Sequence, residues 1–418
     1  MTDLLWPGDD RAGDLFTDAA VLTAMVTVEQ AWLSALVEAG IAPPEARASL
    51  TGLLTPSDAD DIAAGAEAGG NPVIPLVGLL RGRLGPGAAA SRWLHRGLTS
   101  QDVLDTALML CLRDTVDRIR DELRAQAAAL AGLTDRHRAT VMSGRTLTQH
   151  AVPVAFGLKA ATWLAGLLDA AEDLEAVGVR LPVQLGGAAG TLAGPVQLAR
   201  LARARAPERT ALELTDHLAA ALRLRPAPPW HTTRTTVTRA GDALVRCTDA
   251  YGRIGNDVLT LSRPEIGELA EPARTGRGGS STMPQKVNPV LSVLLRRAAL
   301  VAPGLGGQLH LAAAEAGDER PDGAWHVEWP ALRLLARRTA VAASQATELL
   351  AGLQVDADRM RATAEAAAPE LLAEARSLAE LSGDPAAAPT DVGDYLGSTD
   401  LLVDAVLERA ASYLKGAG

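Results

Sequence analysis

The chain has 418 residues, of which 48% are hydrophobic and only 3% aromatic, and its formal net charge at pH 7 is −10. This length allows two or three domains with a large core, and the acidic balance argues against nucleic acid as a general partner. We see no signal peptide and no long uncharged apolar run, so we expect a cytoplasmic protein without a membrane partner.

Apolar residues spaced by three and four dominate the chain and predict helices. The scarcity of aromatic residues also favours closely packed helices over a β-rich fold. The two cysteines, Cys111 and Cys247, lie in apolar helical patterns and should be buried small hydrophobes. The expected helices cover about 18–38, a short segment ending at Leu84, a long segment from about 100 to Gly132, and then 154–177, 235–261, 289–314, 325–353 and 401–414.

These segments predict an all-α protein with an extended bundle of five long helices. We expect a small N-terminal helical domain over 1–98 and the long central bundle over 99–353. A small C-terminal helical domain should then cover 354–418.

Residues 276–289 form a polar loop that is the strongest candidate for a functional site. Three glycines open this loop, Pro284 interrupts it, and Pro289 closes it. Proline suits the first turn of a helix, so the loop should lead into a helix N-terminus, where N–H groups favour an anion. The loop also contains Lys286, one of only three lysines among 40 basic residues. An ordinary glycine-rich connector would show much of the same local pattern.

A second polar segment, from His95 to Asp102, precedes the first long helix. Thr99 or Ser100 is a natural N-cap for that helix. Alternatively, the two hydroxyls present themselves to a substrate carboxylate at the same helix end. The local sequence leaves both interpretations open.

The loop sequence Gly-Ser-Ser-Thr-Met-Pro-Gln-Lys-Val-Asn-Pro, over 279–289, resembles the signature loop of the fumarase/aspartase superfamily. Two earlier segments resemble its other conserved regions in the right order: 99–107, and 144–150 with the sequence Gly-Arg-Thr-Leu-Thr-Gln-His. The resemblance implies a three-domain fold and a homotetramer whose central helices form a twenty-helix core. It also implies that three subunits contribute to each active site.

Finer details resemble the 3-carboxy-cis,cis-muconate cycloisomerases, which act in the protocatechuate branch of aromatic degradation. The supporting stretches are 15–18, 70–77, 186–193, 229–232 and 323–329. Many superfamily lyases have a histidine directly after Gly-Arg-Thr, where this chain has Leu147. The cycloisomerases also lack that histidine. The proton donor therefore stays open between His150 and His95.

The resemblance implies a tricarboxylate substrate and a reaction that needs no cofactor or metal. Ser280 would exchange the α-proton of an aci-carboxylate, and Lys286 and Asn288 would stabilise the developing charge. Thr99, Ser100 and Thr146 would hydrogen-bond carboxylate oxygens, and arginines would neutralise the remaining charge. The substrate-binding candidates are Ser100, Arg145, Thr146, Gln149, His95, His231, Arg234, Ser281, Met283, Asn288 and Arg320, beside the catalytic candidates Ser280, Lys286, His150 and Thr99.

Two other functions remain possible on this scaffold. A C–N or C–X lyase that releases fumarate from a substituted succinate would keep Ser280, Lys286 and Thr99, but Leu147 and the 325–329 stretch favour the cycloisomerase. A non-catalytic structural protein of the crystallin kind is the other possibility. The intact serine loop argues against it.

Overall fold

The structure is a computed structural model that describes residues 3–283 and 285–416, and Pro284 of the predicted loop lies outside this described part. The fold is helical, as predicted. Its helices are α1 (Asp18–Glu38), α2 (Asp58–Gly69), α3 (Val73–Leu84), α4 (Ala89–Trp93), α5 (Ser100–Arg136), α6 (Phe156–Gly178), α7 (Ala193–Leu201), α8 (Pro207–Leu222), α9 (Thr235–Leu261), α10 (Val290–Ala314), α11 (Gly323–Gly352), α12 (Ala357–Ala366), α13 (Ala368–Leu371), α14 (Ala373–Leu381) and α15 (Thr399–Lys415).

The chain groups into two compact units that interleave along the sequence. The first unit comprises residues up to 118, 174–244 and 303–340. The second comprises 119–173, 245–302 and the chain from 341 onward. Each of the five long helices, α5, α6, α9, α10 and α11, contributes a segment to both units. The predicted division into three consecutive domains stays a prediction.

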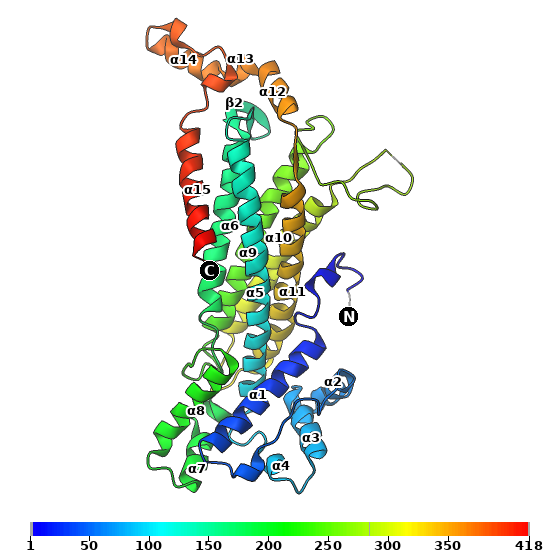
Figure 1. Cartoon of the computed structure of the whole chain (residues 1–418), viewed down its shortest axis with the longest axis vertical. Coiled ribbons are helices and arrows are strands. Elements are labelled where there is room, and N and C mark those ends of the chain that lie inside the picture. Colours follow the sequence, from blue (N-terminus) through cyan, green and yellow to red (C-terminus); the bar gives the residue numbers. More distant parts are fainter. Residues whose placement is uncertain (1–2, 284, 417–418) are drawn as a thin grey trace. The chain divides into compact units, whose positions relative to one another are not determined.

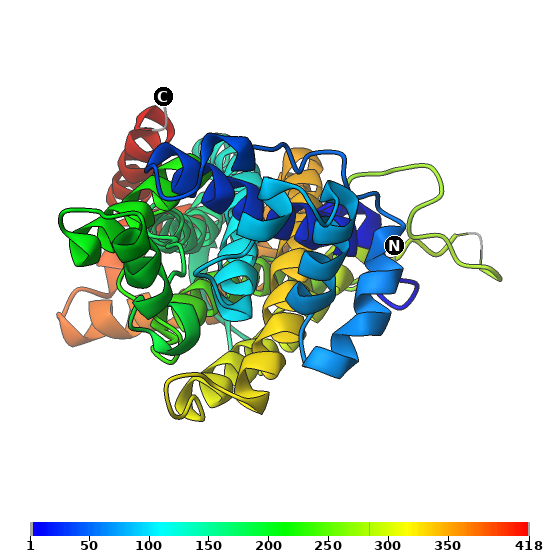
Figure 2. The ribbon, with the colours of Figure 1, turned by 90° about the horizontal axis from the view of Figure 1, so that it is seen from below.

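In the first unit, shorter helices surround the helix segments. Helix α1 packs against α8, which also packs against α7, and α3 packs against α2 and α4. Figure 2 shows the blue N-terminal helices and the green segment that contains α7 and α8. Thr17 caps α1 by accepting a hydrogen bond from the Ala20 N–H, as expected of threonine at this position.

In the second unit, the segments of the long helices pack closely. A methyl group added at Gly255 on α9 would lie 2.9 Å from the Ser292 carbonyl oxygen on α10. The two helices can therefore approach more closely than larger side chains would allow. Trp163 on α6 donates its indole N–H to Asp257 on α9 at 2.8 Å. Figure 1 shows these helices as the long ribbons labelled α5, α6, α9, α10 and α11.

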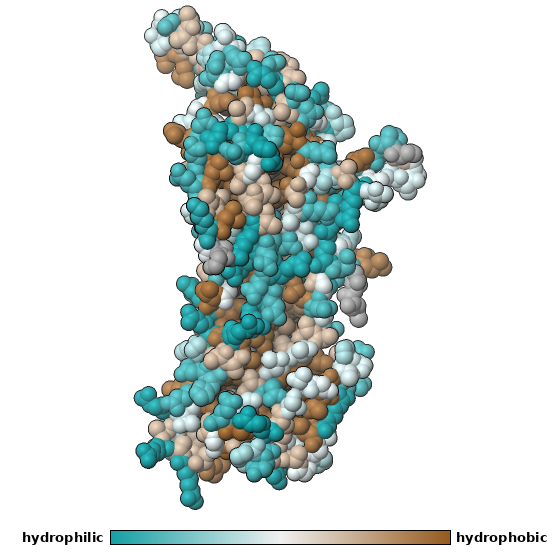
Figure 3. All heavy atoms as spheres, in the orientation of Figure 1, coloured by the Kyte–Doolittle hydropathy of each residue, from teal (hydrophilic) through white to brown (hydrophobic). Residues whose placement is uncertain are grey.

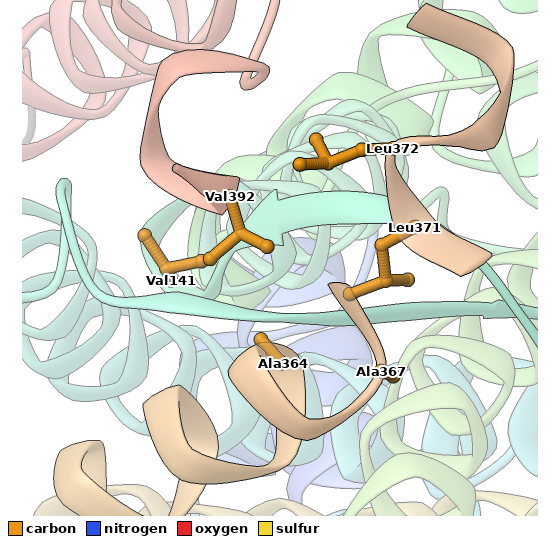
Figure 4. Packing of buried hydrophobic residues seen from close by; sticks show 6 residues of the cluster. All are labelled: Val141, Ala364, Ala367, Leu371, Leu372 and Val392. Atoms are coloured by element: carbon orange, nitrogen blue, oxygen red, sulfur yellow. The ribbon is translucent and has the colours of Figure 1, made fainter. Parts of the chain in front are cut away.

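A β-hairpin in the second unit precedes α6, where the sequence analysis predicted no strand. Strands β1 (Val141–Thr146) and β2 (Gln149–Ala155) pair antiparallel, with Thr146 opposite Gln149. A smaller sheet joins β3 (Leu269–Ala270) to β4 (Gln354–Val355). The hairpin packs against α12 and α13 through a small apolar cluster, which Figure 4 shows in close-up and which consists of Val141, Ala364, Ala367, Leu371, Leu372 and Val392.

Both cysteines are buried as predicted, and burial raises the pKa of each thiol to about 12. These thiols are therefore unreactive packing groups.

Helices α1 and α10 are long and apolar enough to span a membrane by length and composition alone. In α1, half of the apolar window is buried, and the helix packs on α8. Helix α10 instead exposes Val293, Leu300 and Leu311. Figure 3 shows that apolar side chains also reach the surface between polar ones on the face in view.

Candidate active site

The signature loop presents Ser280 with its hydroxyl oxygen facing two backbone donors. The Thr282 and Met283 N–H groups lie 3.3 and 3.2 Å from Ser280 Oγ, and both donate to it. The Ser280 side chain is half-buried. Two donors aimed at one oxygen stabilise negative charge on it, which makes the alkoxide easier to form. The predicted role of Ser280 as the proton-exchanging group stays a prediction that these two donors support.

The neck of the loop is closed by Asn288, which the sequence analysis had predicted to stabilise substrate charge. Its backbone N–H and its side-chain Nδ2 both donate to the Gly278 carbonyl oxygen, at 2.8 and 2.9 Å. Gly278 has φ +74°, and a methyl group there would lie 2.6 Å from the Asn288 carbonyl oxygen. Only glycine fits this crossing. In this structure the Asn288 amide therefore shapes the loop.

The N-terminus of α10 is occupied by a carboxylate from the chain itself. Glu271 accepts hydrogen bonds from the Leu291 N–H at 3.0 Å, the Ser292 N–H at 2.6 Å and the Ser292 hydroxyl at 2.7 Å. This helix end does favour an anion, as predicted, but the anion is Glu271. The donors around Ser280 come from the loop and not from the helix.

The other predicted loop residues lie toward solvent. Ser281, Lys286 and Met283 are exposed, and Met283 retains 41% of its accessible surface. Figure 1 shows the segment between α9 and α10 as a long loop that leaves the helices of its unit. These side chains are thus free to contact a ligand.

The β1–β2 hairpin carries the second predicted region. Thr146 and Gln149 flank its tip and are exposed, as is His150, whose Nδ1 lies 2.5 Å from Ser143 Oγ. Arg145 instead forms two hydrogen bonds to the buried carboxylate of Glu268, at 2.8 and 3.1 Å. Contact between Arg145 and a substrate would require this pair to open.

The tip of the hairpin has an unusual conformation for its residues. Leu147 and Thr148 have φ values of +49° and +74°, and Leu147 is 95% exposed. Two-residue hairpin turns require positive φ, but they favour asparagine and glycine there. An exposed leucine in this position is strained, and such strain often marks a functional site.

In the first unit, the residues before α5 are organised by Asp102. Its carboxylate accepts the Thr99 N–H at 2.9 Å and the N–H groups of Gly186 and Gly187 at 2.8 and 3.0 Å. The Thr99 hydroxyl does not cap the helix and instead accepts a hydrogen bond from Arg320 Nη1 at 2.9 Å. Ser100 begins the helix and is 9% exposed. Thr99 and Arg320 therefore form one polar cluster at a helix N-terminus.

His231 and Arg234 lie in a buried network of the same unit. The Arg234 guanidinium donates to both carboxylate oxygens of Asp105 at 2.7 and 3.0 Å and to Glu328 at 2.6 Å. Burial lowers the pKa of Arg234, but the two carboxylates outweigh it and raise that pKa above its ordinary value. Burial also raises the pKa of Glu328, and the nearby Asp105 charge adds to this rise, which the hydrogen bond and charge of Arg234 only partly offset. Arg234 presents no free guanidinium to a ligand here.

His231 is 3% exposed, and its Nε2 lies 3.0 Å from Asp102 Oδ1. His231 was predicted to contact the substrate, but in this structure its ring is too buried for a ligand at the surface to reach it. The remaining candidate, His95, pairs with Glu29 and is taken up below.

The sequence analysis missed the acidic residues that hold these candidates in place, namely Glu29, Glu268, Glu271 and Glu328. Glu29 carried a usable signal, because it lies in the apolar stripe of α1 between Met25 and Trp32. A charged residue in such a stripe is rarely buried without a partner. The other three acids lie in irregular or mixed segments that give no such signal.

Comparison with known proteins shows the family to which the chain belongs. Residues 57–304 match a lyase family model, which covers more than half of the chain. The serine loop, the Gly-Arg-Thr hairpin and the polar start of α5 occur in the order of that superfamily. The chain belongs to the fumarase/aspartase superfamily.

Two relatives and one solved structure illustrate this membership. The chain is 44% identical over 363 residues to nitrosuccinate lyase of Streptomyces davaonensis, covering 86% of this chain and 75% of that one. It is 40% identical over 370 residues to 3-carboxy-cis,cis-muconate cycloisomerase of Pseudomonas aeruginosa, covering 87% and 78%. The 3-carboxy-cis,cis-muconate lactonizing enzyme of Pseudomonas putida superposes with a TM-score of 0.85 at 31% identity, covering 96% and 97%.

Proposed function

We propose that this chain is a cofactor-independent cycloisomerase that converts 3-carboxy-cis,cis-muconate to 4-carboxymuconolactone. The observation that carries the proposal is the Ser280 hydroxyl held by two loop N–H groups, within a superfamily enzyme. Support for the substrate comes from the cycloisomerase relatives of four bacteria, which are 31–40% identical to this chain.

The reaction forms one carbon–oxygen bond within the substrate. A carboxylate oxygen attacks a carbon of the diene, and the displaced electron pair moves onto the neighbouring carboxylate to give an aci-carboxylate. The α-carbon then takes a proton from the Ser280 hydroxyl, and solvent returns that proton to the alkoxide. Because the attack is intramolecular, the enzyme need only hold the diene in a folded conformation that brings the carboxylate oxygen close to the carbon it attacks.

The replacement of histidine by Leu147 is consistent with this chemistry. In the reverse direction, the leaving group is a carboxylate, which is a weak base and departs without being protonated. An acid beside the leaving group is therefore unnecessary. An exposed apolar residue at the hairpin tip is compatible with such a reaction.

We propose that the cationic groups that meet the substrate are Arg320 and Lys286. Arg145 and Arg234 are each held by carboxylates, whereas Arg320 points to the Thr99 hydroxyl and Lys286 is exposed. The Thr146 and Ser100 hydroxyls add hydrogen-bond donors for carboxylate oxygens.

We further propose that four copies of the chain assemble, with three contributing residues to each site. The exposed apolar residues of α10 support this, since such residues on a long helix suit a helix-to-helix contact.

A second candidate function is the elimination of a small anion from a substituted succinate with release of fumarate. It is favoured by the 44% identity to a nitrosuccinate lyase. Nitrite, like a carboxylate, is a weak base that leaves without protonation, so Leu147 is compatible with both reactions. Ser280 would remove the α-proton in this case.

One assay separates the two functions. Purified protein is mixed in parallel with 3-carboxy-cis,cis-muconate and with nitrosuccinate, and the ultraviolet absorbance of the diene and the release of fumarate are followed. We expect loss of the diene at an enzymatic rate and little fumarate. Release of fumarate and nitrite without loss of the diene would contradict the cycloisomerase function and support the lyase function.

A further inference from the structure

The turn that precedes α5 is held by three polar contacts from different elements. The Trp32 indole N–H of α1 donates to the Arg96 carbonyl oxygen at 2.7 Å. Arg81 of α3 donates to the Leu94 carbonyl oxygen at 2.8 Å. Between these two, His95 Nδ1 lies 2.6 Å from Glu29 Oε1. The backbone on both sides of His95 is therefore fixed, and its ring is fixed as well.

Glu29 is an unusual residue to find at this place. Its side chain is fully buried on α1, one turn before Trp32, and its Oε2 atom has no hydrogen-bond partner in the described structure. Burying a carboxylate is expensive unless it is paired and hydrogen-bonded. A glutamine or a leucine would avoid much of this penalty. The Glu29 charge also interacts with the Arg81 guanidinium, but the side-chain hydrogen bond that Glu29 forms is to His95.

His95 itself has a strained backbone. Its φ is +62°, a left-handed conformation that residues other than glycine rarely adopt. Its side chain is 18% exposed, and its Nε2 forms no hydrogen bond with another described residue. Such strain persists where the surroundings enforce it, often at functional sites. His95 also lies four residues before Thr99, in the turn that leads to the Thr99–Arg320 cluster.

We propose that Glu29 is a positioning residue that orients His95 toward the substrate. This inference rests on the proposed function and adds to it a role for α1. Glu29 accepts the Nδ1–H of His95, which fixes the ring and leaves Nε2 as the atom directed outward. His95 Nε2 then contacts a substrate carboxylate bound beside the N-terminus of α5. Trp32 and Arg81 hold the backbone so that this direction is kept.

A double-mutant cycle tests whether Glu29 acts through His95. We expect E29Q and H95Q each to lower kcat/KM about tenfold, the range for one hydrogen bond to a charged group. We expect most of that loss to lie in KM. The double variant E29Q/H95Q should match H95Q within about twofold, because Glu29 has nothing left to orient. A further tenfold loss in the double variant would overturn the proposal, as would normal kcat/KM in E29Q.

Glu38 provides a matched control. It lies on the same helix with 56% of its side chain exposed, in a long 4.0 Å pair with Arg47. E38Q removes the same charge from α1 and should leave kcat/KM unchanged. If E29Q does not fold, E29D replaces it, since aspartate keeps the charge but is one methylene too short to reach the ring. E29D should lower kcat/KM in the wild-type background and not in H95Q.

A spectroscopic measurement decides the pairing without any substrate. Nitrogen-15 NMR of labelled histidine should show His95 with a hydrogen-bonded proton on Nδ1, and E29L, which removes the acceptor oxygen, should lose that signal while E38Q keeps it. If the protein turned over neither carboxymuconate nor nitrosuccinate, the proposed function would be wrong. The spectrum would still show whether Glu29 accepts the Nδ1–H of His95. A His95 spectrum that E29L leaves unchanged would overturn the assignment of Glu29.

Discussion

At the scale of single residues, acidic side chains decide which basic and hydroxyl groups remain available. Glu268 holds Arg145, Asp105 and Glu328 share Arg234, and Glu271 fills the N-terminus of α10. Sequence patterns identified the basic residues, because arginine in a motif suggests a bound anion. They could not show that the anion belongs to the chain, since that depends on residues far apart in sequence.

Removing Arg234 should strongly destabilise the first unit. R234M leaves Asp105 and Glu328 buried without a counter-charge, which costs about 3–5 kcal/mol when a buried pair loses one partner. The free energy of unfolding from urea titration measures this loss. R239M changes an exposed arginine of α9, which begins directly after Arg234, and should shift that free energy by less than about 0.5 kcal/mol. Equal losses of unfolding free energy in the two variants would show that the Arg234 network does not stabilise the protein.

At the scale of elements, the hairpin of β1 and β2 was missed for a definite reason. The Leu147–Thr148 turn lacks the asparagine and glycine that signal a two-residue hairpin. The helices were easier, and α1 and α9 have the predicted bounds because their apolar stripes are long and regular. Local pattern thus found the helices and missed the strained turn.

Replacing the turn by its preferred residues should stabilise the protein. L147N/T148G places asparagine and glycine at the two positive φ values and should raise the free energy of unfolding by about 1 kcal/mol. Thermal unfolding followed by circular dichroism measures the gain. T146N, one residue earlier on the strand, should give none. A loss of stability in L147N/T148G would mean that the turn is not strained.

The N-terminal segment is tied to α11 by an ion pair that should respond to pH. The Asp9 carboxylate accepts two hydrogen bonds from Arg337, both at 2.8 Å. Burial raises the pKa of Asp9, but the Arg337 hydrogen bond and charge outweigh it and hold that pKa below its ordinary value of 3.8. A lowered folded-state pKa contributes stability above the unfolded pKa, and that stability is lost as pH falls through the folded pKa.

The difference in unfolding free energy between wild type and D9N should therefore be largest near pH 7 and shrink below about pH 4. D10N changes the exposed neighbour and should show no such trend. Urea titrations at several pH values give both curves. A D9N difference that stayed constant down to pH 3 would contradict the pairing.

At the scale of the whole molecule, the resemblance supplied what local patterns could not. Helix periodicity indicated an all-α protein, but it could not show that five long helices each contribute to two units. The order of the motifs identified the superfamily. Whether the enzyme is a cycloisomerase or a nitrosuccinate lyase depends on its contacts with the substrate, which the motifs do not specify. The sequence patterns likewise could not show how copies of the chain assemble.

The proposed tetramer should depend on the exposed apolar residues of α10. Leu300 retains 72% of its accessible surface, and L300E would bury a charge in a helix-to-helix contact. Light scattering after size exclusion should give four chains for wild type and fewer for L300E, with activity lost in parallel. L402E on α15, at an exposed leucine outside the long helices, serves as the control. A wild-type monomer with full activity would exclude shared sites.

The most direct test of the account follows the proton that Ser280 is proposed to deliver. The reaction with 3-carboxy-cis,cis-muconate is run in D₂O, and the lactone is examined by NMR and mass spectrometry. We expect one deuteron at the α-carbon with wild type, and a rate lowered by about 10²–10⁴-fold in S280A, with S281A much less affected. Full activity and normal deuterium incorporation in S280A would contradict the role of this serine.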